Sequence, residues 1–353
     1  MRGTIGPGKG GSALIEVSHL TKRYGDHTAV DDLSFHIEKG QIYGLLGPNG
    51  AGKSTTMNIM TGCLAATAGQ VTVGGWDIFE DAAKAKKLLG YLPERPPLYL
   101  DRTPQEYLTF VGRAKGLSPR QLEAQLCYVM EVTRTADVAH RLIKNLSKGY
   151  QQRVGIAQAL LGDPEVIILD EPTVGLDPKQ IIEIRSLIQT LGRDRTVILS
   201  SHILSEVQAV CQTILILSKG KLVACDTPEN LERRFAGTTT VALTAQAGTE
   251  EVRRLLAFLP GASQLTFQPV GEDKCQVTLE TDWDEDVLCR DIFFLFSRAQ
   301  LPLLRLTTAR AGLEEIFLEL TRDTADPLSA PEEEAVQGEA DTRETPGEEE
   351  DAE

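Results

Sequence analysis

A glycine-rich segment, GPNGAGKS at residues 47–54, limits the folds that are open to this chain. It follows an apolar run at residues 41–46 and precedes a helical pattern at residues 54–60. The spacing matches G-x-x-x-x-G-K-[ST] in the strand–loop–helix context that this pattern requires. Its glycines let backbone N–H groups face phosphate oxygens, and the helix that follows directs its positive end at them. The segment therefore predicts a phosphate-binding loop in an α/β fold, in preference to an ordinary glycine-rich turn.

The loop supplies most of the candidate nucleotide-binding residues. Lys53 can reach the β and γ phosphates of a nucleotide, and the Ser54 hydroxyl group can ligate Mg²⁺. We expect nucleotide contacts from nine consecutive residues: Gly47, Pro48, Asn49, Gly50, Ala51, Gly52, Lys53, Ser54 and Thr55.

Two acidic residues follow a second apolar strand, which is predicted at residues 166–169. Asp170, at the end of that strand, is placed to hold Mg²⁺ through water. Glu171 is placed to polarise the attacking water. Taken alone, this pair could equally be a strand end that reaches solvent, but a phosphate-binding loop upstream favours the metal-binding and catalytic roles.

Apolar runs alternate with helical patterns from residue 14 to residue 229, which is typical of an α/β sheet covered on both faces. The expected strands are residues 14–17, 41–46, 166–169 and 196–199. Between residues 95 and 146 the pattern becomes helical, with helices expected at residues 105–115 and 119–132. We interpret residues 95–150 as a helical subdomain inserted between strands.

A different pattern begins after residue 229. Residues 230–322 predict the order β-α-β-β-α-β, a small α+β ferredoxin-like domain, with a last helix at residues 313–320. Its expected elements are strands 239–244, 264–269, 275–280 and 302–307 and helices 249–259 and 284–299. Residues 1–13 are expected to be a flexible lead-in. Residues 323–353 are expected to be a disordered acidic tail, because they offer almost no apolar side chain to offset their ordering entropy.

Composition excludes several classes of function. The net charge is −15, but residues 323–353 hold 13 acidic residues against one basic residue, Arg343, which leaves −3 for the rest. A nearly neutral body gives no support to nucleic-acid binding through a basic surface. No run reaches roughly 18 apolar residues, and the start lacks an apolar signal region, so we expect neither an integral membrane protein nor an exported one. Six scattered cysteines indicate buried, reduced thiols rather than disulfides or a zinc site.

Further motifs make the chain similar to the ATP-binding cassette (ABC) ATPases. Residues 146–153, LSKGYQQR, end 17 residues before Asp170 and resemble the signature motif of that family. Residues 175–178, GLDP, resemble its D-loop, and His202 resembles its switch histidine. Tyr24 matches the aromatic residue that stacks on adenine, although an exposed aromatic residue in a turn is also common. The similarity covers residues 15–229.

The resemblance implies a P-loop NTPase fold that binds ATP and Mg²⁺ and hydrolyses ATP. The catalytic residues it implies are Lys53, Glu171 and His202. In the family, two cassettes pair head to tail around two ATP molecules. Ser147 and Gly149 of one cassette would then meet the γ-phosphate bound by the other, and Asp177 would link the two sites. Because this chain has one cassette, we expect a homodimer or pairing with another ABC subunit.

Three positions differ from the commonest family pattern. Lys148 and Tyr150 replace a glycine and the glutamine of the signature motif, and Glu94 stands where the Q-loop has glutamine. A carboxylate at this position can still contact water or Mg²⁺, but it opposes phosphate unless the metal screens its charge. Glu94 therefore joins Ser54 and Asp170 as a candidate metal ligand, with its role open.

The unusual residues Lys148, Tyr150 and Glu94, the last of them within YLPE at residues 91–94, make the chain resemble the cassettes of ABC-2 type exporters, including the gliding-motility group. The C-terminal domain resembles the accessory domain that is common in that group. The resemblance implies an ATPase subunit at the cytoplasmic face of the membrane that drives a separate integral-membrane permease. Residues 96–99 form an apolar segment that would either receive the permease or pack the helical insertion against the sheet. Two other interpretations are a soluble cassette acting on ribosomes or DNA and a regulatory cassette that binds ATP without turnover.

Overall fold

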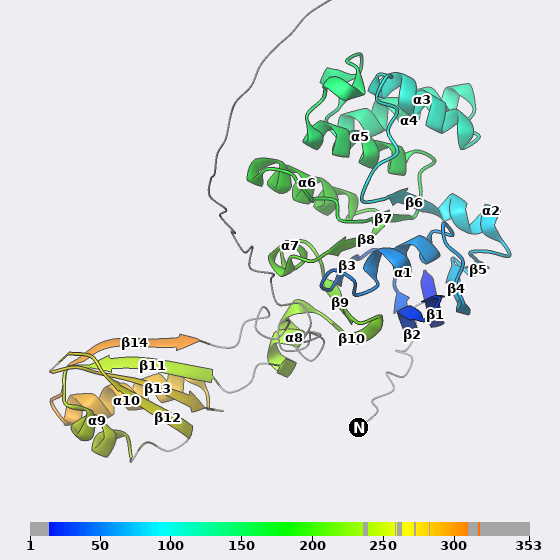
Figure 1. The fold of residues 1–353 in the computed structure, drawn as a ribbon. Helices are drawn as coiled ribbons and strands as arrows, with labels where there is room; N and C mark the ends of the chain where they lie inside the picture. The colour runs from blue at the N-terminus through cyan, green and yellow to red at the C-terminus, as the bar shows by residue number, and fades with distance from the viewer. Residues whose placement is uncertain are drawn as a thin grey trace, which may run out of the picture.

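The computed structural model describes residues 14–235, 239–257, 259, 263–271, 273–281, 283–309 and 317. A six-stranded sheet carries the phosphate-binding loop (Figure 1), in the order β10-β9-β3-β8-β7-β6. Its strands are β3 (Ile42–Leu46), β6 (Leu89–Leu92), β7 (Val166–Leu169), β8 (Thr196–Ser201), β9 (Thr213–Ser218) and β10 (Lys221–Asp226). They are parallel except for the antiparallel pair of β9 and β10. The predicted strands at residues 41–46, 166–169 and 196–199 are confirmed.

A second sheet is antiparallel and has four strands in the order β2-β1-β4-β5. In the sequence, β1 and β2 come before β3 of the first sheet, and β4 and β5 lie between β3 and β6. Its strands are β1 (Ile15–Tyr24), β2 (His27–Ile37), β4 (Ala68–Val73) and β5 (Trp76–Asp77). The strand expected at residues 14–17 is only the start of β1, which continues to Tyr24. Neither β2 nor β4 is predicted from the sequence, because buried and exposed residues mix along both strands and their apolar runs are short.

Helices surround the two sheets, and several of them begin at strong caps. They are α1 (Lys53–Met60), α2 (Ala82–Ala85), α3 (Pro104–Ala114), α4 (Pro119–Val132), α5 (Lys148–Leu160), α6 (Pro178–Leu191), α7 (Leu204–Gln208) and α8 (Pro228–Phe235). Short 3₁₀ turns cover Lys86–Leu88, Ala136–Val138 and Ile143–Asn145. Thr103, Ser118 and Asp177 form capping boxes before a proline, which starts α3, α4 and α6. The predicted helices at residues 105–115 and 119–132 are confirmed as α3 and α4.

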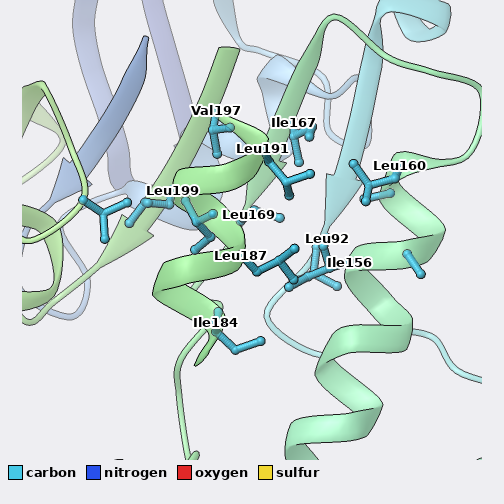
Figure 2. Packing of buried hydrophobic residues seen from close by; sticks show 14 of the residues in the cluster. Leu92, Ile156, Leu160, Ile167, Leu169, Ile184, Leu187, Leu191, Val197 and Leu199 are labelled. Atoms are coloured by element: carbon cyan, nitrogen blue, oxygen red, sulfur yellow. The ribbon is translucent and has the colours of Figure 1, made fainter. Parts of the chain in front are cut away.

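Successive residues of the central strands face two different cores. Ile167 and Leu169 of β7 lie in a core covered by α5 and α6 (Figure 2). Val166 and Ile168 lie in the core that contains α1 and the antiparallel sheet. Because side chains alternate between the two faces of a strand, a strand covered on both faces is an unbroken apolar run. This double coverage explains why these strands can be found in the sequence.

The first core gives a test of the packing. Ile156 of α5 is fully buried in it, whereas Ile182 of α6 is 63% exposed. We expect Ile156→Ala to lower the free energy of unfolding by about 2–5 kcal/mol, because it loses buried surface and leaves a cavity. Ile182→Ala, the same truncation on a helix surface, should change it by less than about 0.5 kcal/mol. Equal effects in urea unfolding would contradict the described packing.

The C-terminal part has the predicted β-α-β-β-α-β order. Its elements are β11 (Thr239–Ala245), α9 (Thr249–Leu256), β12 (Ser263–Pro269), β13 (Cys275–Thr281), α10 (Glu285–Arg298) and β14 (Leu303–Ala309). The four strands form an antiparallel sheet of order β12-β13-β11-β14, and residues of α9 and α10 share its core. Residues 1–13 and 323–353 and, apart from Phe317, the last predicted helix lie outside the described residues.

The division into domains at residues 229 and 230 stays a prediction. Helix α8 crosses this division, and its Leu231 is fully buried in the core of the six-stranded sheet. Phe317 also packs against that core. Residues from both sides of the predicted division therefore contact the first core.

Two other expectations concern the chain as a whole. None of the helices in the described ranges has the length and hydropathy needed to cross a bilayer. The six cysteines form no disulfide in this structure, and Cys63 and Cys127 are exposed. This corrects the expectation that all six thiols are buried.

Candidate functional site

The phosphate-binding loop joins β3 to α1, and its shape depends on glycine. Gly50 and Gly52 have φ angles of 80° and 96°, in the left-handed region that other residues rarely adopt. A Cβ on Gly52 would lie 2.5 Å from the carbonyl oxygen of Ala29, and a Cβ on Gly47 would lie 2.5 Å from that of Leu217. Glycine is therefore required both by the backbone conformation and by the close approach of neighbouring strands.

Lys53 begins α1, and its side chain is buried at the loop. Its Nζ donates hydrogen bonds to the carbonyl oxygens of Gly47 at 2.7 Å and Pro48 at 3.2 Å, and it lies 3.6 Å from Oε1 of Glu171. Burial lowers the pKa of Lys53, and the nearby carboxylate of Glu171 opposes this shift. The side chain places a positive charge at the start of a helix, where phosphate oxygens would meet the loop.

Asp170 and Glu171 follow β7 directly. Asp170 is almost fully buried, and its Oδ1 accepts hydrogen bonds from Ser54 Oγ at 3.2 Å and Ser200 Oγ at 2.6 Å. Glu171 Oε2 lies 3.0 Å from Nδ1 of His202. These groups meet because parallel strands β7 and β8 end at the same edge of the sheet, which is also where β3 enters the loop.

A cavity of about 540 Å³ opens beside these groups. It is lined by Tyr24, His27, Ala29, Asn49, Gly50, Ala51, Gly52, Lys53, Ser54, Thr55, Glu94, Glu171, Val174 and His202. The fold thus brings Tyr24, Glu94 and His202, from three distant parts of the sequence, to the predicted loop. Three of the predicted residues that do not line the cavity contact residues that do: the carbonyl oxygens of Gly47 and Pro48 accept hydrogen bonds from Lys53, and Asp170 accepts one from Ser54.

Three of the lining residues, His27, Ala29 and Val174, are not predicted from the sequence. His27 pairs with Tyr24 across the hairpin of β1 and β2, and this brings Ala29 to the cavity as well. The two-residue connection at residues 25–26, Gly-Asp, is a recognised hairpin signal that could have placed both residues. Val174 has no such signal and is brought in by the turn after β7.

Comparison with known proteins identifies the family. A family model described as ABC transporter matches residues 30–174. Over 312 residues the chain is 33% identical to the linearmycin resistance ATP-binding protein of Bacillus subtilis, covering 88% of this chain and 99% of that protein. The chain belongs to the ABC transporter family.

Other ABC proteins agree with this assignment. The chain is 32% identical to the Nod factor export ATP-binding protein I of Ralstonia nicotianae over 324 residues, which is 90% of this chain and 96% of that protein. A solved structure of the ATP-binding subunit of an ABC transporter matches it with a TM-score of 0.58 and 30% identity, over 63% of this chain and 93% of that one. The predicted P-loop NTPase fold is confirmed, and the chain is an ABC ATPase that binds ATP.

The signature and D-loop residues of this ABC chain do not lie in the loop cavity. Ser147, Gly149 and Asp177 line a second cavity of about 320 Å³. Ser147 Oγ accepts a hydrogen bond from the Tyr150 N–H at 3.4 Å and starts α5. Asp177 Oδ1 accepts one from the Gln180 N–H at 2.9 Å and starts α6. One chain therefore carries two separate cavities, each lined by a different group of predicted residues.

Two unusual positions of the signature motif have clear contacts. Tyr150 Oη donates a hydrogen bond to Asp137 Oδ2 at 2.7 Å, and this bond raises the pKa of the tyrosine. Lys148 extends toward the D-loop, where a Cβ on Gly175 would overlap its Nζ. Tyr150 thus ties α5 to the 3₁₀ turn at Ala136–Val138, and Gly175 leaves room for Lys148.

The apolar segment at residues 96–99 divides into a buried and an exposed part. Leu98 packs against the first core. Tyr99 and Leu100 are about half exposed, and the ring of Tyr99 lies 5.5 Å from that of Phe110, which is 52% exposed. The inner part therefore packs the insertion, while Tyr99, Leu100 and Phe110 form an apolar surface, here called the Tyr99 surface.

Proposed function

We propose that this chain is the ATP-hydrolysing subunit of an ABC-2 type exporter, and that it works as a homodimer at the cytoplasmic face of a membrane with a separate permease. The position of Glu171 in the cavity, 3.0 Å from His202 and 3.6 Å from Lys53, carries the hydrolytic part of the proposal. Relatives aligned over 96% or more of their length, named for linearmycin resistance and Nod factor export, support the exporter part.

Each predicted residue that lines the cavity is assigned a role consistent with its position. Lys53 and the loop N–H groups bind the β and γ phosphates, and Tyr24, which lines the same cavity, stacks on adenine. Glu171 accepts the proton of the attacking water. His202, hydrogen-bonded to Glu171, contacts the γ-phosphate. The chain's contribution is thus to hold ATP and one water molecule in the geometry of attack.

Mg²⁺ would be held by Ser54 and Asp170. Their Oγ and Oδ1 atoms lie 3.2 Å apart, and hydroxyl and carboxylate oxygens are the ligands that this ion prefers. Burial lowers the pKa of Lys53, and the charge of Glu94, which lines the same cavity, is among those that oppose this shift, so we assign Glu94 a contact to the ion through water. When bound, the ion neutralises charge on the phosphate oxygens.

The second cavity supports a dimer. Ser147 and Gly149 lie outside the loop cavity of their own chain, so an ATP site that includes them needs a second chain. In a head-to-tail homodimer, each chain would supply the loop to one ATP and the signature residues to the other. Asp177, which caps α6 beside the signature residues, would link the two sites.

Isolation of the tagged protein from native membranes in mild detergent tests the exporter proposal. We expect a polytopic membrane protein to co-purify in stoichiometric amount and to dock on the Tyr99 surface. Tyr99→Asp should lose this protein, whereas Phe79→Asp, at an exposed aromatic residue outside that surface, should retain it. Recovery only in the soluble fraction, free or bound to ribosomes, would contradict the proposal and favour a soluble cassette ATPase. Retention by both variants would place the docking surface elsewhere.

The adenine contact of Tyr24 gives a separate prediction. Tyr24→Ala should weaken ATP binding by about 5- to 150-fold, because stacking of a base on an aromatic ring contributes about 1–3 kcal/mol. Tyr24→Phe keeps the ring and should bind within about twofold of the wild type. Calorimetric titration of the three proteins with ATP measures the difference, and equal affinities of the two variants would rule out stacking.

A further inference from the structure

We propose that Ser200 is a positioning residue for ATP hydrolysis, whose hydroxyl group fixes the backbone of Glu171 so that the carboxylate stays in the cavity. This inference rests on the proposed role of Glu171. Ser200 is not among the residues that line the ATP cavity, and it belongs to none of the sequence motifs described above. Any effect it has on the reaction must therefore pass through its neighbours.

The hydroxyl group of Ser200 joins two consecutive acidic residues. Its Oγ accepts a hydrogen bond from the N–H of Glu171 at 2.8 Å and donates one to Oδ1 of Asp170 at 2.6 Å. Leu169 and Leu199 are paired in the parallel strands β7 and β8, so the residues that follow them, Asp170 and Ser200, lie side by side. Ser200 is 0% exposed, so solvent does not compete for this hydroxyl group.

Glu171 needs to be held because its backbone conformation is unfavourable. Its φ is 47°, in the left-handed region where a side chain crowds the backbone. Pro172 follows it, and a residue before proline is further restricted toward extended conformations. Such strain persists only where the surrounding structure maintains it. Here the N–H of Glu171 is held by Ser200, and its carbonyl oxygen accepts from the Val174 N–H at 3.2 Å.

The end of β8 thus fixes Glu171 at two points. Ser200 holds the backbone, and His202, two residues later, contacts the carboxylate. Without the Ser200 hydroxyl group, the left-handed backbone loses one of its two bonds and the carboxylate can leave the position of attack. Ser200 makes no direct hydrogen bond to Lys53 or to the loop, and Asp170, whose Oδ1 accepts from both Ser200 and Ser54, keeps its bond from Ser54, so the binding of ATP should remain.

Ser200→Ala tests this inference because it removes the hydroxyl group and little else. We expect kcat to fall about tenfold or more, while ATP affinity, measured with Mg²⁺ and with EDTA, changes less than about threefold. Ser218→Ala is the matched control, since Ser218 Oγ is buried in β9 of the same sheet and has no hydrogen-bond partner. That control should keep the wild-type kcat. Ser200→Thr retains a hydroxyl group and should restore part of the rate.

The double variant with Ser200→Ala and Glu171→Gln distinguishes the positioning role of Ser200 from the proposed catalytic role of Glu171. If Ser200 acts through Glu171, adding Ser200→Ala to Glu171→Gln should not lower the residual rate further. The inference is overturned if Ser200→Ala keeps the wild-type kcat, if it weakens ATP binding instead, or if its effect persists beside Glu171→Gln. It is also overturned if Ser200→Ala lowers kcat only together with the melting temperature and Ser200→Thr restores none of the lost kcat. Wild-type hydrolysis by Glu171→Gln alone would instead refute the proposed role of Glu171.

Discussion

Lys53→Ala is expected to abolish ATP binding at micromolar nucleotide, with a rise in Kd of about 100-fold or more. Lys53 is the buried cation of the loop, and its ammonium group already donates to two loop carbonyl oxygens. Hydrogen bonds to charged groups contribute about 1.5–3 kcal/mol each, and this cation would meet two phosphates. Its removal also leaves the nearby carboxylate of Glu171 uncompensated in a site that must accept an anion. Calorimetric titration with ATP measures the loss.

Lys39→Ala is the control for this variant. Lys39 pairs with Glu165 at the surface, at 2.7 Å, and the side chains are 68% and 43% exposed, respectively. Its truncation should leave ATP affinity and melting nearly unchanged. A folded Lys53→Ala protein that binds ATP with normal affinity would contradict the assignment of residues 47–54 as the phosphate-binding loop.

Glu171→Gln is expected to lower kcat by about 10²- to 10⁴-fold, the usual contribution of a general base, while ATP binding persists. The amide has nearly the shape of the carboxylate and can still face His202, but it cannot take a proton from water. Because hydrolysis would no longer open the proposed dimer, the variant should elute as a dimer in the presence of ATP. Phosphate release and size-exclusion chromatography measure the two effects.

The same substitution at Glu165 separates this effect from a general change of charge. Glu165→Gln removes a carboxylate next to β7 that pairs with Lys39 at the surface, and it should hydrolyse ATP at the wild-type rate. Unchanged hydrolysis by Glu171→Gln would remove Glu171 from the mechanism. A variant that remained monomeric with ATP would instead argue against the proposed dimer.

The predictable parts of the fold are those whose cause is local. Strands β3, β7 and β8 are covered on both faces, so their apolar runs are continuous and easily found. Helices α3 and α4 carry capping boxes and proline at their starts, which mark their boundaries in the sequence. Strands β2 and β4 lack such signals because one face of the antiparallel sheet is only partly buried.

The candidate site shows the same division. The loop, Asp170 and Glu171 are predicted because glycine spacing and a charge at a strand end have direct chemical meanings. Ser200 is not predicted, because it owes its place to Asp170, which follows a strand far away in the sequence. Pairing between distant strands such as β7 and β8 is a long-range property that the residues themselves do not record. His27 lies in a local hairpin instead, and the Gly-Asp signal at residues 25–26 could have placed it.

By itself the sequence determined the P-loop NTPase fold, the family and the position of the glycine-rich loop, since these follow from residue types at short, fixed spacings. Only the tertiary structure decided which groups meet. The order of strands in the sheet brings β7 and β8 together, so that Ser200 at the end of β8 and His202 just after it hold Glu171. The same packing places Ser147 and Asp177 in a separate cavity, because α5 and α6 begin away from the loop of their own chain.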